Sequence, residues 1–310
     1  MKNISRKFLT LLICLVFVLF AMASGEDKES EPTPTATAVS SVANNDVEEE
    51  AVVETEVEPV EEDVELIQEM VLVDQDGVLI KALSIEDGTF GDIEVKLYIE
   101  NNSTQPITVQ TRDFSVNGIM VDPIMSTDVA QDKKASDGIS IFKSELEGAG
   151  IEKIANIEFT FHIFNTDSWD TIFDTDLIKI DTSLADSYIQ EYDITGEVLY
   201  DANGIKIVYQ GLSKDGFLGP EVNLYIENST DSTVTIQTRD TSVNGFMIDP
   251  ILSSDVVPGK KAYDEMTFMS SNLEESNITE IEEIELSFHI FDAATWDTIV
   301  DTEAITITIK

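Results

Sequence analysis

Two residue types in this chain are rare and could each bind a ligand. Beyond residue 23 the only arginines are Arg112 and Arg239, and the only tryptophans of the whole chain are Trp169 and Trp296. A guanidinium fork can hold an acidic or sugar ligand through paired hydrogen bonds. An exposed indole can stack on a sugar ring. These four residues form the candidate ligand-binding site, which predicts that they are exposed on one face of the fold.

The same residues also have a structural interpretation. Arg112 is followed by Asp113, and a carboxylate on a neighbouring strand, such as Asp122, could pair with the guanidinium and fix the register of a hairpin. With 61 acidic residues in the chain, such an ion pair is the more ordinary interpretation. Each tryptophan precedes the last strand of its segment, where it could cover an open end of the core and bond its N–H to a nearby acceptor.

The two histidines, His162 and His289, carry no recognisable catalytic arrangement. Both fall on the polar side of an alternating pattern, so we interpret them as surface residues. Neither has a serine or cysteine partner that the sequence identifies. We therefore predict no catalytic residue and no cofactor, and we interpret the protein as a non-enzyme.

Carboxylates are abundant, but their spacing is uninformative. Asp167, Asp170, Asp174 and Asp176 form one cluster, yet no D-x-[DN]-x-[DN]-G loop with a distal glutamate occurs. A glycoside hydrolase needs two converging carboxylates, and any acidic β protein offers such pairs by chance. We predict no specific metal site, and weak association with divalent cations stays open.

The candidates occur in pairs because the chain repeats itself. Residues 97–182 align without a gap to residues 224–309 at an offset of 127 (224 − 97), with 44 identities in 86 positions. A site in one copy should therefore have a partner in the other. Identity between the copies does not separate ligand binding from a structural role, because a duplication preserves both.

Within each copy the pattern of apolar residues predicts strands. Ile93, Val95, Leu97 and Ile99 alternate with polar residues, which is typical of strands with one buried face. Asn117-Gly118, like the equivalent pair at 244–245, predicts a tight hairpin, because a type I′ turn needs positive φ at both central positions. Roughly seven to eight short strands in about 115 residues predict an all-β fold of two tandem antiparallel Ig-like β-sandwich modules. A short helical turn is expected at 144–150 and again at 271–277.

The ends of the chain predict export. Residues 1–23 have basic residues, an apolar run and a small-residue site, so we expect a signal peptide cleaved after Ala23. Ser24 stands where a lipoprotein would have its acylated cysteine, so free secretion is favoured over surface retention. Residues 24–63 are interpreted as a disordered acidic tether containing threonine and proline. The expected modules are then 64–183 and 193–310, joined by a short linker at 184–192.

Charge limits the partners. Residues 1–23 hold three basic and no acidic residues, so the net charge of −43 becomes −46 (−43 − 3) once they are removed. Such a polyanion repels nucleic acid and anionic membrane surfaces. The only cysteine lies within the expected leader, so thiol chemistry and disulfides are excluded from the mature chain.

The chain resembles the Ig-like modules of unknown function in secreted and lipid-anchored surface proteins of Gram-positive bacteria. The likeness rests on the leader, the acidic tether and residues 97–118, where a strand ending in Asn-Asn-Ser leads to a second strand and an Asn-Gly turn. It implies a fold and an extracellular or cell-surface location, but no activity. We expect a non-enzymatic binding or adhesion module whose extracellular or cell-envelope ligand is unknown. A passive structural spacer is the alternative, and an envelope-acting glycoside hydrolase is a weaker one.

Overall fold

A computed structural model describes residues 66–309, all of which belong to the unit Val60–Lys310. The expected signal peptide and the whole of the expected tether lie outside the described residues. Among the residues described, no helix is long and apolar enough to cross a membrane.

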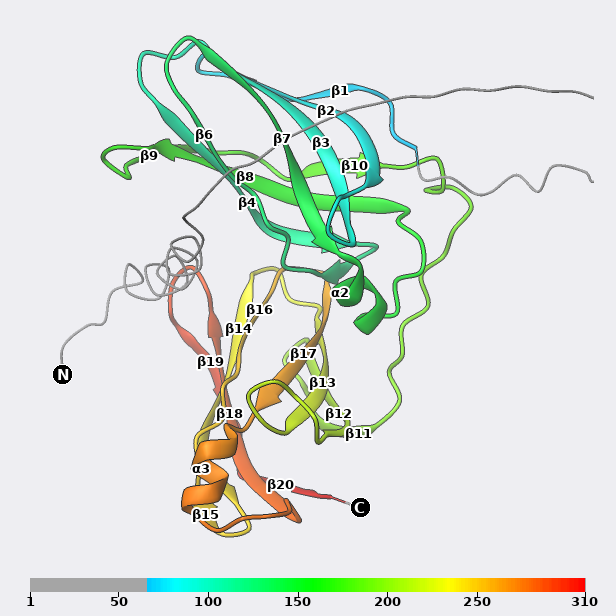
Figure 1. The fold of residues 1–310 in the computed structure, drawn as a ribbon. Coiled ribbons are helices and arrows are strands. Elements are labelled where there is room, and N and C mark those ends of the chain that lie inside the picture. Colours follow the sequence, from blue (N-terminus) through cyan, green and yellow to red (C-terminus); the bar gives the residue numbers. More distant parts are fainter. Residues whose placement is uncertain (1–65, 310) are drawn as a thin grey trace, which may run out of the picture. The chain divides into compact units, whose positions relative to one another are not determined.

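The first sandwich is built from ten strands and one short helix (Figure 1). In chain order these are β1 (Met70–Gln75), β2 (Val78–Asp87), β3 (Asp92–Asn101), β4 (Ile107–Val116), β5 (Ile119–Met120), β6 (Ser126–Val129), β7 (Lys133–Phe142), α2 (Lys143–Gly148), β8 (Asn156–Asn165), β9 (Thr171–Asp174) and β10 (Ile178–Asp181). One layer has the order β1-β2-β3-β7. The other layer pairs β8 with β4, with β9 and β10 along the far edge of β8 and β5 and β6 along β4.

The second sandwich repeats this arrangement element by element. It comprises β11 (Glu197–Ala202), β12 (Ile205–Ser213), β13 (Glu221–Asn228), β14 (Val234–Val243), β15 (Phe246–Met247), β16 (Ser253–Val256), β17 (Lys261–Thr267), α3 (Ser270–Glu275), β18 (Glu283–Asp292), β19 (Thr298–Asp301) and β20 (Ile305–Thr308). The structural repeat has the same offset as the aligned segment but starts earlier in the chain, because β1 begins at Met70 and β11 at Glu197. Each sandwich has ten strands, more than the seven to eight expected.

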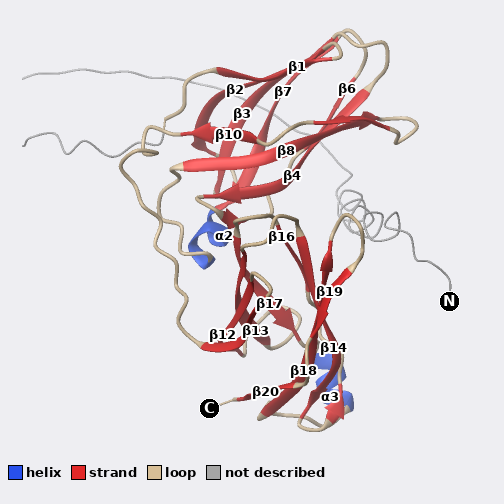
Figure 2. Cartoon of the chain, turned by 180° about the vertical axis from the view of Figure 1, so that it is seen from behind, coloured by secondary structure: helices blue, strands red, loops and turns tan. Residues whose placement is uncertain are grey.

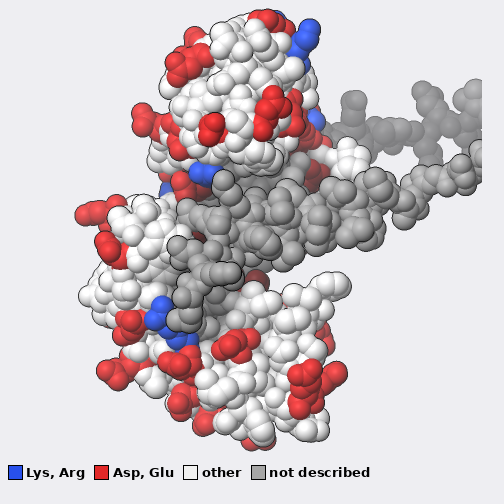
Figure 3. Space-filling model, turned by 90° about the vertical axis from the view of Figure 1, so that its left-hand side faces the viewer, with Lys and Arg blue, Asp and Glu red and all other residues white. Residues whose placement is uncertain are grey.

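The all-β sandwich fold predicted from the alternating pattern is confirmed (Figure 2). Val95, Leu97 and Ile99 of β3 are fully buried, and their polar neighbours point outward. Two separate hydrophobic clusters result, one among β1–β10 and one among β11–β20. The outward positions are largely polar, and Figure 3 shows many Asp and Glu but few Lys and Arg on the face that it presents. The two expected helical turns are present as α2 and α3.

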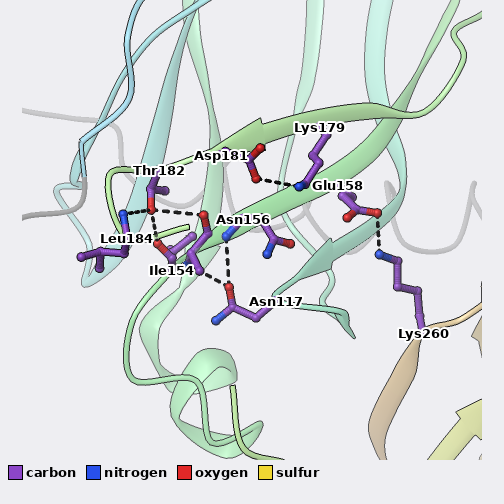
Figure 4. Close-up of polar contacts among 10 residues, drawn as sticks. Asn117, Ile154, Asn156, Glu158, Lys179, Asp181, Thr182, Leu184 and Lys260 are labelled. Atoms are coloured by element: carbon purple, nitrogen blue, oxygen red, sulfur yellow. Dashed lines mark hydrogen bonds and ion pairs between the residues drawn. The ribbon is translucent and has the colours of Figure 1, made fainter. Parts of the chain in front are cut away.

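The Asn-Gly hairpin that joins β4 to β5 is also confirmed. Asn117 and Gly118 have φ values of 51° and 83°, as a type I′ turn requires. The Asn117 side chain is buried, and its Oδ1 accepts from the backbone N–H groups of Ala155 and Asn156 at 2.8 and 3.1 Å (Figure 4). Its Nδ2 donates to the carbonyl of Lys153 at 2.7 Å. The turn residue therefore also anchors the start of β8.

The two sandwiches contact each other through this hairpin. The backbone N–H of Lys261 donates to the carbonyl of Gly118 at 3.0 Å, which pairs β5 with β17 in parallel. Nearby, Lys260 Nζ lies 2.5 Å from Glu158 Oε2, with both side chains mostly buried (Figure 4). Tyr192, in the expected linker, donates its hydroxyl to the carbonyl of Asn117 at 3.1 Å. The linker is thus hydrogen-bonded to the first sandwich.

Candidate functional site

A bulge in β14 sets the position of the second arginine. The pairing of β14 with β18 shifts register between Arg239 and Ser242, and Asp240 within the bulge has a left-handed φ of 51°. Such a bulge bends the strand and re-aims its side chains. Arg239 is exposed, and its Nη1 lies 3.5 Å from Asp301 Oδ1 on β19. The guanidinium therefore pairs with a carboxylate on β19, which is not one of the carboxylates that the sequence suggested as its partner.

The histidines are buried, which corrects the surface interpretation. His162 and His289 are 8% and 9% exposed. Their strand positions do face outward, but a phenylalanine two positions along each strand packs against the imidazole, with ring centroids 5.2 Å apart in the first copy and 5.0 Å in the second. His289 Nδ1 lies 2.6 Å from the same Asp301 Oδ1 that faces Arg239. A buried imidazole needs such a partner, because an unpaired polar group in the interior is costly.

The tryptophans are exposed at the other end of this arrangement. Trp169 and Trp296 are 70% and 58% exposed, whereas tryptophan is usually well buried. Each indole lies almost parallel to the phenylalanine beneath it, at 5.5 Å and interplanar angles of 19° and 16°. Each also has a left-handed φ, 64° and 67°, which is rare for a bulky residue.

The loop holds this strained backbone in place by hydrogen bonds. The N–H of Trp296 donates to the carbonyl of Asp292 at 2.9 Å. Asp292 Oδ1 in turn accepts from the N–H groups of Ala294 and Thr295 at 2.9 and 2.8 Å. In the first copy the Oδ1 of Asn165 performs the same role for residues 167 and 168. The indole is therefore fixed before any ligand arrives.

We call this arrangement the aromatic–polar strip. In the second copy it consists of Trp296, Phe291, His289, Asp301 and Arg239. The equivalent residues of the first copy are Trp169, Phe164, His162, Asp174 and Arg112, in which His162 Nδ1 lies 2.5 Å from Asp174 Oδ1. Arg239 and Trp296 thus lie at opposite ends of the second strip; in the first strip the contacts run from Trp169 to Asp174, and Arg112 is included because it is equivalent to Arg239. In each copy the arginine and the tryptophan are both exposed, and their role in ligand binding stays a prediction.

Polar side chains on the next strands extend each strip. In the first copy Gln110 Nε2 donates to Ser126 Oγ at 3.1 Å, and Thr108 Oγ1 donates to Asp128 Oδ1 at 2.6 Å. The second copy has the same two contacts at 3.2 and 2.5 Å. Burial raises the pKa of the Asp113 carboxyl in the bulge, opposed by the Thr160 hydroxyl and the Arg112 guanidinium. The surface is built for hydrogen bonding across several strands.

The strip provides groups that can contact a ligand, but it does not place a nucleophile beside a base. Each histidine Nδ1 is paired with a carboxylate, and within residues 66–309 no hydroxyl hydrogen-bonds either imidazole. Over the same residues no group of three or more His, Cys, Asp or Glu side chains could hold a metal ion. The chemistry that the strip supports is stacking and hydrogen bonding.

Sequence reasoning missed the phenylalanines and the histidine–aspartate pairs. The spacing from histidine to aspartate, 162 to 174 and 289 to 301, did not mark the pairs, because a repeat without gaps gives every identical pair of residues the same spacing in both copies. A phenylalanine also follows each histidine two positions later, on the same strand face. Neither spacing indicates by itself that the loop would fold the tryptophan back over the phenylalanine.

No protein-family model and no curated protein matches this chain. Among solved structures it is similar to the YadV chaperone, with 13% identity, 70% of this chain and 92% of that chain covered, and a TM-score of 0.24. It is also similar to a Salmonella enterica SafA pilin in complex with the SafB chaperone (12% identity, 70% and 89% covered, TM-score 0.18) and to red sea bream transglutaminase (10%, 79% and 31%, 0.18). Values this low carry no argument about function.

Proposed function

We propose that this chain is a non-enzymatic binding protein that acts outside the cell, at a bacterial surface, and recognises its ligand through the two aromatic–polar strips. One observation carries the proposal: both copies hold an exposed indole over a phenylalanine on a left-handed backbone. A left-handed bulky residue and an exposed aromatic ring each cost free energy. A ligand that covers the indole gives both features a use.

The extracellular setting is supported by the sequence. A basic and apolar leader ending in Ala-Met-Ala precedes an acidic segment with threonine and proline. The resemblance to surface modules of Gram-positive bacteria points the same way. Weak association of the many carboxylates with divalent cations is part of this proposal, but the strips themselves need no cation.

The test is co-sedimentation of residues 24–310 with isolated Gram-positive cell walls, in calcium and in chelator. We expect saturable binding in both buffers and its loss in the Trp169→Ala/Trp296→Ala double variant. The Phe90→Ala/Phe217→Ala variant is the matched control, because these two loop phenylalanines are 88% and 99% exposed and lie outside the strips.

Binding that depends on calcium and survives the tryptophan substitutions would replace this proposal with cation-bridged adhesion. An absence of wall binding in either buffer would favour the passive spacer. Equal losses in the tryptophan variant and in its phenylalanine control would show that any exposed aromatic ring suffices, and the strips would then have no special role.

A further inference from the structure

We propose that both strips bind one ligand class, a neutral polysaccharide with a repeating unit of hexopyranose rings. This inference rests on the proposed function and adds the chemistry of the ligand. It follows from three observations: the shape of the exposed indole, the charge around it, and which surface residues the two copies have in common.

Each indole is largely exposed and lies beside hydrogen-bonding groups. Its inner face covers Phe291, or Phe164 in the first copy, and its backbone is fixed by the loop. A hexopyranose has a matching construction, with C–H groups on a ring face and hydroxyls around the rim. The ring face can stack on the indole while hydroxyls reach the carboxylate and guanidinium farther along the strip. A purely apolar ligand would cover these polar groups without offering them hydrogen bonds in place of water, which disfavours it.

Charge favours a neutral sugar over an acidic one. Each strip has one arginine and one aspartate, and in the second copy these already face each other at 3.5 Å. The whole chain has 61 acidic and 18 basic residues, and on the face that Figure 3 presents Asp and Glu outnumber Lys and Arg. An anionic polymer would be repelled over its whole length. Hydroxyl groups can instead donate to the exposed carboxylates at no such cost.

The two copies have diverged at many positions, whereas the strip residues and much of the chain beside them are identical. They differ at 42 of the 86 aligned positions (86 − 44). On the same sheet, exposed Lys179 and Asp181 of β10 correspond to threonines in β20, so this layer tolerates change at its surface. All five strip residues are nevertheless identical. So are the four polar neighbours: Thr108, Gln110, Ser126 and Asp128, matched by Thr235, Gln237, Ser253 and Asp255.

The loop before the tryptophan gives the sharpest contrast. All four residues at 165–168 differ from those at 292–295, but the hydrogen bonds that set the backbone are the same. The placement of the indole is therefore the same although the loop before it has changed, while residues 170–172, which follow it, are identical to 297–299. Two sites of the same construction on one chain suit a ligand that repeats the same group. A polysaccharide meets that requirement.

The experiment uses the protein's own tryptophans. Because the chain contains only these two, its indole emission reports the two strips and nothing else. Residues 24–310 are titrated with amylose, dextran, laminarin, mannan and galactan, and with polygalacturonate as the anionic counterpart. We expect at least one neutral polymer to change the emission saturably and to protect both indoles from acrylamide quenching. The Trp169→Phe and Trp296→Phe variants then report each strip separately.

Valency provides a second readout. Replacing one tryptophan by alanine should weaken binding of the active polymer about tenfold or more, since linked sites bind with avidity. The same substitution should only halve the number of sites for a matching hexasaccharide. Phe217→Ala, at a site outside the strips, should change neither result. Thermal melting of each variant confirms that it is folded.

Failure of this inference is distinguishable from failure of the proposed function. Silence with all the neutral polymers, or binding of polygalacturonate alone, overturns the inference. If wall binding still depends on the tryptophans in that case, the proposed function stands and the ligand belongs to another class, such as a protein. Neutral-polymer binding that both tryptophan-to-alanine variants retain would overturn the inference and the proposed site together.

Discussion

At the scale of single residues, the Asp301 carboxylate of the second strip has two partners although it is half-exposed. Asp301 contacts both His289, which is buried, and Arg239, which is exposed. The carboxylate is half-exposed, so solvent weakens these ion pairs. Its main contribution is to satisfy a buried imidazole, which otherwise lacks a partner.

We expect Asp301→Asn to lower the free energy of unfolding by about 1 kcal/mol, less than is usual for a hydrogen bond to a charged group, because water reaches the site. Urea denaturation monitored by circular dichroism measures this difference. Glu303→Gln, an exposed carboxylate two positions along the chain, is the control and should change little. Equal effects of the two substitutions would mean that the contact with His289 contributes nothing.

The burial of His162 could not be predicted from the sequence. Alternation correctly placed His162 on the outward side of β8, but it could not predict that Phe164 and Trp169 fold over that side and bury it. That burial depends on the left-handed backbone of the tryptophan in its loop. Bulky residues rarely adopt this conformation, so the sequence gives no reason to expect it there. The sequence also indicates Arg239 as a candidate, but it does not indicate that Asp301 is its partner. That contact becomes apparent only when β19 is seen to pair with β18.

At the scale of elements, the Asn-Gly hairpins were the most predictable feature, because their turn type needs the conformations that these residues favour. The sequence could not show that the two copies would use the hairpin differently. A Cβ added at Gly118 would lie 3.3 Å from the Tyr192 hydroxyl, whereas one added at Gly245 would meet nothing within 4 Å. The first hairpin is enclosed by neighbouring chain, and the second is open.

This difference predicts unequal costs for equal substitutions. Gly118 and Gly245 have φ values of 83° and 82°, so alanine at either position should cost about 1–2 kcal/mol of backbone strain. Gly118→Ala should cost up to about 1 kcal/mol more, because it also crowds Tyr192 and the hydrogen bond from its hydroxyl to Asn117. Denaturant unfolding of the two variants provides the comparison. Equal destabilisation would show that Tyr192 gives way freely.

At the scale of the whole molecule, carboxyl groups with shifted pKa values make stability depend on pH in two opposing ways. Burial raises the pKa of the Asp264 and Glu145 carboxyls above their ordinary values. Such groups take up protons in the folded state first, so they favour folding as the pH falls. Glu100 behaves in the opposite way, since hydrogen bonds from Tyr98, Asn102 and Lys134 lower its pKa to about 2.

We therefore expect stability to rise as the pH falls from neutrality towards the ordinary pKa values of these carboxyls and to fall again below about 4.5, the ordinary pKa of a glutamate. In the upper range the raised carboxyls lose their unfavourable charge, and in the lower range the contribution of Glu100 disappears. Urea midpoints measured between pH 3 and 8 would reveal the maximum. Asp264→Asn should flatten the upper part, and a midpoint that falls steadily from pH 7 to 5 would contradict the prediction.

The uniform offset between the two sandwiches has a genetic consequence. Every strand from β11 to β20 has its counterpart in the first sandwich, in the same order and without an insertion between the copies. Recombination between equivalent positions of the two coding segments would therefore delete one complete repeat in frame, wherever the crossover fell. Its product would start in one copy, finish in the other and still encode a full set of strands in their proper order. The reciprocal product would encode three sandwiches. The length of this protein can thus change by whole sandwiches without interrupting a strand.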